Sequence, residues 1–406
     1  MAVAFFLPVY GRLVPPFIAL MFLNWLIDGR FVKNLGRLCK EKCRLQIFSF
    51  ALIYILYLAG MAWSTNSDYG LFDLEVKMSL LIFPLIFSTV PFTNLGYRNK
   101  IMFAFVAGCA FGSLLLLGHA GWSLLENQAE GAFYYIPLGW HFHPSYLSMY
   151  LNLAIVFLMM HYQEERVSKH LRVILTLLIL LFLLMTFLLS SKAGLIALLI
   201  SVGLVILFSM FNRRSFFPGV TFLGMFITVL LFSYFFAPFA FNRFSAVNPA
   251  LNEPTEQATR VAPESSADRL AIWNSSLTII RNNFWFGTGT GDVKDALLHS
   301  YSTGKIVPAY RLRLNAHSQY LQTFITLGIV GFLVLVLMLA LPAIIAVRRR
   351  DMVYLLFLFV FGFNILVESM LEEQAGVVYY AFFNILLFSM QKETGKQLPV
   401  SPFESK

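Results

Sequence analysis

A histidine at the start of a long apolar segment is the residue that most directly suggests acid–base chemistry. The stretch RLNAHSQYLQTF, residues 313–324, places His317 before an apolar run that ends near Ala346. An imidazole titrates near neutral pH and can accept a proton from a sugar hydroxyl. Taken alone, such a histidine can equally be a structural residue at a membrane interface.

Basic residues beside other apolar segments suggest a site for an anionic group. Arg269 falls in the first turn of a predicted amphipathic helix, at the positive end of its dipole and on roughly the same face as Trp273. It suits a diphosphate, or it is a solvated arginine on a loop helix. Lys192 follows two serines at the start of an apolar segment, where it can reach water or place its charge over a phosphate. Arg311 and Arg313 come just before the histidine.

Acidic residues gather after a later apolar segment. The sequence VESMLEEQAG places Glu368 and Glu372 four residues apart, which puts them on one helix face. A carboxylate at membrane depth costs a few kcal/mol unless it is paired, so we expect Glu368 to have a partner such as an arginine. A structural ion pair and a catalytic role both fit this pattern.

A further stretch rich in aromatic residues and histidines is GWHFHPSYLSMYL, residues 139–151. His141 and His143 are two residues apart, which is poor spacing for two metal ligands on one helix, and we predict no metal site there. Pro144 is well placed to begin a helix, with Tyr146 in its first turn. His143 and Tyr146 are candidates for contact with a sugar, or anchors at a membrane interface.

The elements that position these residues are apolar helices. The chain has 406 residues, of which 58% are hydrophobic and 13% are charged, and this is too apolar for a soluble surface. A bilayer core of about 30 Å needs roughly 20 apolar residues per helix, and lipid requires internally hydrogen-bonded backbone. We predict an all-α, polytopic transmembrane bundle of about eleven to twelve helices. The predicted spans are residues 4–27, 46–63, 74–91, 101–118, 144–161, 172–190, 193–211, 217–241, 316–346, 352–368 and 376–390.

The basic residues indicate which side each loop faces. Lys and Arg cluster in alternate loops, which are cytoplasmic by the positive-inside rule. The net charge of +9 is therefore a topology signal and does not imply a nucleic-acid partner. The opposite, outer side receives loops 64–73, 119–143, 242–315 and 369–375. The predicted organisation is N-terminal transmembrane helices over 1–241, a large outer loop with its own short helices over 242–315, C-terminal transmembrane helices over 316–391, and a cytoplasmic tail over 392–406.

The outer loop contains the glycine-rich stretch FWFGTGTGD, residues 284–292. No predicted strand precedes it, no Lys-Ser or Lys-Thr follows it, and it faces away from cytoplasmic nucleotides, which together exclude a nucleotide-binding loop. We predict a tight glycine turn, which returns the chain to the membrane and allows close backbone approach to a ligand.

The candidate residues gather on the outer side, whereas the helices, apart from the ends of the spans, are nearly free of charge. A transporter is expected to have ionisable groups within its helices, with inverted repeats or helices broken around paired charges, and the sequence shows neither. We therefore expect a reaction at the outer membrane surface, on a substrate with an anionic head and a lipid tail. The outer candidates are Lys192, Arg269, Arg311, Arg313, His317 and Glu368.

Motifs over about half the chain occur in a recognisable order: LSSKAGLIALL, then DRLAIW and FWFGTGTGD, then NAHSQYLQTFITLGIVGF, then VESMLEEQAG. This order resembles the O-antigen ligase and O-antigen polymerase superfamily of polytopic membrane glycosyltransferases. The resemblance implies a helical glycosyltransferase of the C-type fold in the bacterial inner membrane, with its active site facing the periplasm. It implies transfer of a glycan from undecaprenyl diphosphate to an acceptor hydroxyl, usually on the lipid A core, without a metal or cofactor.

The resemblance also implies roles for individual residues. Arg269 matches the loop arginine that holds the donor diphosphate, and His317 matches the base that acts on the acceptor, so these two are the predicted catalytic residues. The chain has Lys192 where the family commonly has Arg, and Ser318 where it commonly has Asn. Lysine keeps the charge but loses the bidentate fork. The predicted substrate-binding residues are Lys192, Arg311, Arg313, Tyr146, His143, Trp273 and Glu368.

Three versions of this activity share the donor and differ in the acceptor. A ligase transfers to the lipid A core, a polymerase transfers to another lipid-linked repeat, and a third version transfers to a protein or an exopolysaccharide. The alternative from another class is a lipid-linked glycan transporter or flippase. The expected partners are the lipid-linked donor, a glycan acceptor and the lipid bilayer.

Overall fold

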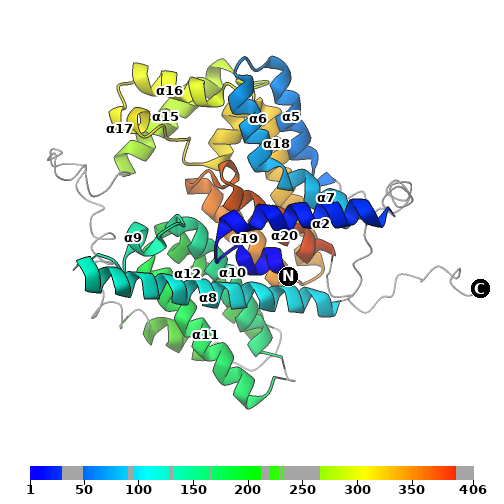
Figure 1. The fold of residues 1–406 in the computed structure, drawn as a ribbon, viewed down its shortest axis with the longest axis vertical. Helices are drawn as coiled ribbons and strands as arrows, with labels where there is room; N and C mark the ends of the chain where they lie inside the picture. The colour runs from blue at the N-terminus through cyan, green and yellow to red at the C-terminus, as the bar shows by residue number, and fades with distance from the viewer. Residues whose placement is uncertain are drawn as a thin grey trace, which may run out of the picture.

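The computed structural model describes residues 1–29, 49–89, 95–127, 131–164, 167–211, 220–228, 231 and 266–389 (Figure 1). Within these ranges every regular element is a helix, so the predicted all-α class is confirmed for this part of the chain. The helices are α1 (Ala2–Phe6), η1 (Gly11–Leu13), α2 (Val14–Asp28), α5 (Leu52–Gly60), η2 (Met61–Trp63), α6 (Ser67–Lys77), α7 (Ser79–Thr89), α8 (Leu95–Asn127), α9 (Tyr135–Gly139), α10 (Pro144–Tyr162), α11 (Lys169–Leu188), α12 (Lys192–Phe211), α15 (Ser266–Asn282), α16 (Val293–Thr303), α17 (Val307–Arg311), α18 (Gln319–Arg348), α19 (Met352–Val367), η4 (Met370–Glu372) and α20 (Gln374–Ser389).

Among the described residues, six helices are long and apolar enough to cross a membrane. They are Gly11–Asp28, Gly96–Glu126, Pro144–Tyr162, Lys169–Leu188, Lys192–Ser209 and Gln319–Arg348. Three more apolar helices are shorter: Leu52–Trp63, Met352–Val367 and Gln374–Ser389. The chain is thus a multi-pass membrane protein, while the expected count of about eleven spans is not confirmed. The predicted span 74–91 is divided between α6 and α7.

The short apolar helices lie inside the bundle. The side chains of α20 are buried from Gly376 to Phe388, and α10 is buried along almost its whole length. α10 packs on α8, α11, α12 and α19, and α19 packs on α12, α18 and α20. The longer α18 presents an apolar stripe at helical spacing, as expected for a helix that faces lipid. The exposed residues of this stripe are Val330, Leu333, Leu337, Leu341 and Ile344.

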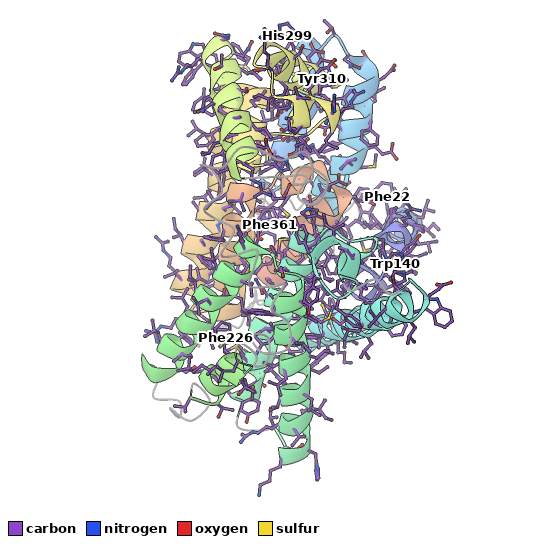
Figure 2. The ribbon with its side chains drawn as sticks, turned by 90° about the vertical axis from the view of Figure 1, so that its left-hand side faces the viewer. Phe22, Trp140, Phe226, His299, Tyr310 and Phe361 are labelled. Atoms are coloured by element: carbon purple, nitrogen blue, oxygen red, sulfur yellow. The ribbon has the colours of Figure 1, made fainter. Side chains whose placement is uncertain are left out.

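The helices of the predicted outer loop form a layer on one side of the molecule. α15, α16 and α17 pack on one another, and α15 and α16 also contact α18. Together with α9 they lie at the left in Figure 1, and Figure 2 looks onto this side, with His299 and Tyr310 at one end. Their own apolar cluster includes Ile272, Leu297 and Tyr301. The described part of the predicted outer loop, α15–α17, is therefore a packed layer of helices on one side of the bundle, which we call the outer layer.

The glycine-rich turn after α15 docks on a break in α18. Gly328 has φ 64° and ψ −160°, which interrupts the helix. The backbone N–H of Thr288 donates to the carbonyl of Ile325 at 2.8 Å, and that of Gly289 donates to Thr326 at 3.0 Å. The turn thus satisfies carbonyls that the broken helix leaves without partners, which a buried backbone requires. The expected glycine turn is present, and the backbone that it approaches closely is that of α18.

The break at Gly328 brings two backbone segments into close contact. A Cβ atom at Gly328 would lie 2.3 Å from the carbonyl oxygen of Trp285, and one at Gly287 would lie 2.4 Å from that of Thr326. The two backbones therefore meet where only glycine fits. Because peptide groups fill the break, it differs from the charge-lined interruptions of transporter helices.

Replacing Gly328 with Ala is expected to destabilise the protein. The added Cβ meets the Trp285 carbonyl, and the positive φ is unfavourable for alanine, for a cost of about 1–3 kcal/mol. The apparent Tm of the purified protein should fall by roughly 2–4 °C per kcal/mol. Gly203→Ala in α12 is the matched control, because nothing lies within 4 Å of its Cβ position. Equal Tm values for the two variants would contradict this account of the break.

Candidate active site

His317 lies in the turn that precedes α18 and is held by local contacts. Its φ is 46°, a left-handed conformation that residues with a Cβ adopt at a cost. Its backbone N–H donates to Asn315 Oδ1 at 2.9 Å, and Ser318 is the N-cap of α18. Only 4% of His317 is exposed. A strained backbone at a buried polar residue is typical of a functional position.

The carboxylate of Glu368 contacts both predicted catalytic residues. Glu368 follows the end of α19, its Oε1 lies 3.4 Å from His317 Nδ1, and its Oε2 lies 3.9 Å from Arg269 Nη2. Burial works to raise the pKa of this carboxyl group, but the hydrogen bond from His317 and nearby positive charges lower the pKa below its ordinary value on balance. Glu368 is therefore an anion held between an imidazole and a guanidinium, which agrees with the expected pairing to an arginine.

A cavity of about 640 Å³ opens beside this pair. Five of the predicted site residues line it: His143, Tyr146, Arg313, His317 and Glu368. Its walls come from five separate parts of the chain. The other lining residues are Tyr10, Gly11, Arg12, His141, Phe142, Lys294, Leu314, Asn315, Glu373, Gln374 and Ala375.

Three cationic side chains line the cavity together with its carboxylates. They are Arg12, Lys294 and Arg313, of which the first two were not predicted as site residues. The Lys294 ammonium donates to the backbone carbonyl of Arg313. Burial and the neighbouring charge of Arg313 lower the pKa of Lys294. A cavity with cations, carboxylates and an imidazole suits a ligand that has an anionic group and hydroxyls.

The N-terminal segment forms one wall of the cavity because it docks on α8. Two glycines of α8 permit this approach, since a Cβ at Gly108 would lie 2.2 Å from the Phe5 carbonyl oxygen and one at Gly112 would lie 2.5 Å from that of Pro8. The docked segment carries Arg12 to the cavity in the helix η1. Arg12 lies within the predicted span 4–27, and a charged residue at membrane depth is itself a signal of function.

His141 and His143 have different partners. His141 Nε2 lies 3.0 Å from the carbonyl oxygen of Val9, and it thereby helps to hold the N-terminal segment. His143 Nδ1 accepts from the backbone N–H of Ser145 at 3.4 Å as the N-cap of α10, which begins at Pro144 as predicted. The ring of His143 also meets Tyr146 edge to face at 6.1 Å.

The remaining predicted residues lie outside the lining of the cavity. Arg269 reaches its edge through Glu368. Trp273, one turn further along α15, packs against the apolar cluster of the outer layer. Arg311 is the last residue of α17 and is exposed. Lys192 begins α12 and is half-buried, and α12 meets α10 two residues later, where Asn152 Nδ2 donates to the carbonyl of Gly194 at 2.9 Å.

A buried ion cluster formed by Lys77, Asp73 and Glu372 was not predicted from the sequence. Lys77 is fully buried, contacts the carboxylate of Asp73, and lies 3.1 Å from Glu372 Oε1. Lys77 lies at the start of the predicted span 74–91, in a part of the span that the expectation of nearly uncharged helices did not cover. A buried charge with dedicated partners at membrane depth is the signal that would have identified it.

A second cavity, of about 660 Å³, lies between α15 and α16. Neutral polar side chains dominate its lining, including Asn274, Thr278, Asn283 and His299. The predicted site residues are not part of this lining, so we place the candidate chemistry at the first cavity.

Replacing Glu368 with Gln is expected to make the fold less sensitive to acid. A carboxyl group with a lowered folded-state pKa stabilises the fold above its unfolded-state pKa of about 4.3, and this contribution is lost as pH falls through the folded-state value. Between about pH 6 and about pH 3.5, wild type should lose more Tm than Glu368→Gln. Glu126→Gln, at an exposed position in α8, should follow wild type. An equal loss in wild type and Glu368→Gln would contradict the pairing.

Comparison with known proteins finds a family model that matches part of the chain. Residues 176–336 match the family model Wzy_C, which is described as O-antigen ligase. This range includes Arg269, Arg313 and His317, which lie at or beside the cavity, while Glu368 falls outside it. No curated protein matches the chain. The matched segment supplies the imidazole and the guanidinium that meet at the buried carboxylate, and the match supports membership of the O-antigen ligase superfamily.

Proposed function

We propose that the chain transfers a glycan from undecaprenyl diphosphate to a sugar hydroxyl of the lipid A core, at the periplasmic face of the bacterial inner membrane. The observation that carries this proposal is the meeting of His317, Glu368 and Arg269 beside a cavity with three further cations. The family match supports a membrane enzyme of the ligase or polymerase type. The donor, the acceptor and the residue roles are the proposal.

His317 takes the proton of the acceptor hydroxyl in this mechanism. Its Nδ1 faces Glu368, so Nε2 is the ring atom that receives the proton. The carboxylate fixes the orientation of the ring and stabilises the imidazolium that forms, as the acidic member of a catalytic triad does. A positioned general base typically contributes about 10²–10⁴-fold to the rate.

The cations stabilise the departing diphosphate. The acceptor oxygen bonds to the anomeric carbon while the bond from that carbon to the diphosphate oxygen breaks, and negative charge develops on the leaving group. Preorganised positive groups at that position are commonly the largest catalytic contribution. Arg313 and Lys294 line the cavity, and Arg269 reaches its edge through the carboxylate. Lys192 keeps its predicted role as a further cation for the donor.

The proposed periplasmic location of the site rests on the arrangement of the outer layer. The cavity includes residues 313–317, which follow α17, and α15–α17 lie together with α9 on one side of the bundle (Figure 1). The loops that the positive-inside rule assigns to the cytoplasm alternate with the segments of this side. An undecaprenyl diphosphate donor would then enter the site from the outer leaflet.

The test of the proposal is transfer by the purified protein with a defined lipid-linked donor and a lipid A core acceptor. We expect wild type to form the glycosidic bond, and His317→Ala to lower kcat by about 100-fold or more because the base is lost. His299→Ala is the matched control, since His299 lies in the second cavity at the far end of the outer layer (Figure 2). It should stay within about twofold of wild type.

The products of the same assay separate the alternatives. Growth of one lipid-linked repeat on another, without transfer to the core, would assign a polymerase. Movement of the lipid-linked glycan across vesicles without bond formation would assign a transporter, and the glycosyltransferase proposal would then be wrong. Full activity in folded His317→Ala would make His317 an anchor at the membrane interface.

Arg313 and Arg311 were both predicted to bind substrate, and only Arg313 lines the cavity. Arg313→Ala should therefore raise the KM for the lipid-linked donor by about tenfold, because a cation next to the anionic group is lost. Arg311→Ala, two residues away and exposed, should change that KM by less than about twofold. Steady-state kinetics over a range of donor concentrations measures both values. An equal effect of the two substitutions would contradict the position of the diphosphate in this cavity.

A further inference from the structure

The base and its carboxylate partner belong to different segments of the chain. His317 precedes α18, and Glu368 follows α19, which returns across the bundle. Their contact at 3.4 Å therefore depends on how the turn before α18 is held against the turn after α19. A misplacement of about 1 Å in such a pair can cost about 100-fold in rate.

Two buried glutamines in the first turns of α18 connect these segments. Gln322 Oε1 accepts from the backbone N–H of Ala316 at 3.1 Å, directly before the histidine. Gln319 Oε1 accepts from the backbone N–H of Leu371 at 2.7 Å, three residues after the glutamate. Both glutamines are at most 1% exposed. One amide thus holds the turn of the base, and the other holds the turn of the carboxylate.

The donor ends of both amides point to one carboxylate. Gln319 Nε2 lies 3.3 Å from Glu372 Oε1, and Gln322 Nε2 lies 3.4 Å from Glu372 Oε2. An ionised carboxylate only accepts hydrogen bonds, whereas an amide has one accepting and one donating end. Glu372 therefore selects the orientation in which each amide oxygen faces the backbone N–H that it holds.

Lys77 stabilises the buried carboxylate of Glu372. Its ammonium lies 3.1 Å from Glu372 Oε1, contacts Asp73, and lies over the ring of Tyr57 at 4.7 Å from the centroid. Lys77 has no exposed surface, and a carboxylate buried without a cation is strongly destabilising. The Tyr57 hydroxyl is 3.3 Å from Thr323 Oγ1, which joins this cluster to α18 once more.

We propose that Lys77 is a positioning residue for the reaction. Acting through Glu372 and the two glutamines, it holds the imidazole beside its carboxylate partner without touching the substrate. The inference rests on the proposed function, because it assigns Lys77 to the geometry of the same base. Lys77 lies outside the lining of the cavity, so the effect of its loss should differ from the loss of a donor contact.

The test compares two variants of the cluster in the glycan-transfer assay, with rates expressed per folded molecule. Lys77→Met and Glu372→Gln should each lower kcat by about 10–100-fold while the donor KM stays within about threefold, because the base is displaced and the donor contacts remain. Glu372→Gln leaves the Lys77 contact with Asp73 in place. It therefore decides the question if Lys77→Met does not fold.

The matched control is a buried ion pair away from the cavity. Arg98 donates from Nη1 to Asp351 Oδ2 at 2.6 Å, between the starts of α8 and α19, and neither residue lines the cavity. Arg98→Met should lower Tm and leave kcat per folded molecule within about twofold. This separates a positioning effect from a general loss of stability.

Each outcome has a defined meaning. Wild-type kcat in folded Glu372→Gln, or a loss equal to that of Arg98→Met, would overturn the positioning role while the proposed function stands. A raised donor KM with unchanged kcat would assign the cluster to donor binding and would also overturn it. Absence of transfer by wild type would overturn the proposed function itself, and this inference with it.

Discussion

The pairing of one buried carboxylate with an arginine and a histidine is the constraint on which the site depends. Glu368 is 7% exposed, and a charge withdrawn from water to this extent requires compensation from its neighbours. The compensation comes from the first helix of the outer layer and from the turn that follows the layer, with Arg269 in α15 and His317 before α18. Loss of either partner leaves the buried anion with less compensation. The same interaction that allows the carboxylate to be buried therefore also brings His317 and Arg269 together.

Local signals in the sequence predicted much of the fold and part of the site. Hydropathy over about 20 residues identified the apolar helices, and Pro144 marked the start of α10, because both signals are contained within one segment. The expected arginine partner of Glu368 followed from the cost of burying a carboxylate, which holds in any fold. The helices of the outer loop followed from apolar residues at helical spacing in α15.

The remaining features depend on contacts between segments that are distant in the sequence. Nothing in the residues around Arg12 or Lys294 indicates that they line the same cavity. The helix is interrupted at Gly328 because the glycine turn 284–290 supplies hydrogen bonds that replace those lost within the helix. The apolar periodicity of the sequence continues through this position, so the pattern alone does not indicate the break. Lys77 is different, because a lysine beside an apolar segment is a signal that the local sequence contains.

The cavity is built from both the first and the last parts of the described chain. Tyr10, Gly11 and Arg12 line it together with Glu368, Glu373, Gln374 and Ala375. The N-terminal wall rests on the glycines of α8. The N-terminal wall is synthesised before α19 and α20, so the lining of the cavity is complete only after the segment up to Ala375 has joined the bundle. Formation of the cavity therefore depends on helices that are far apart in the chain coming together.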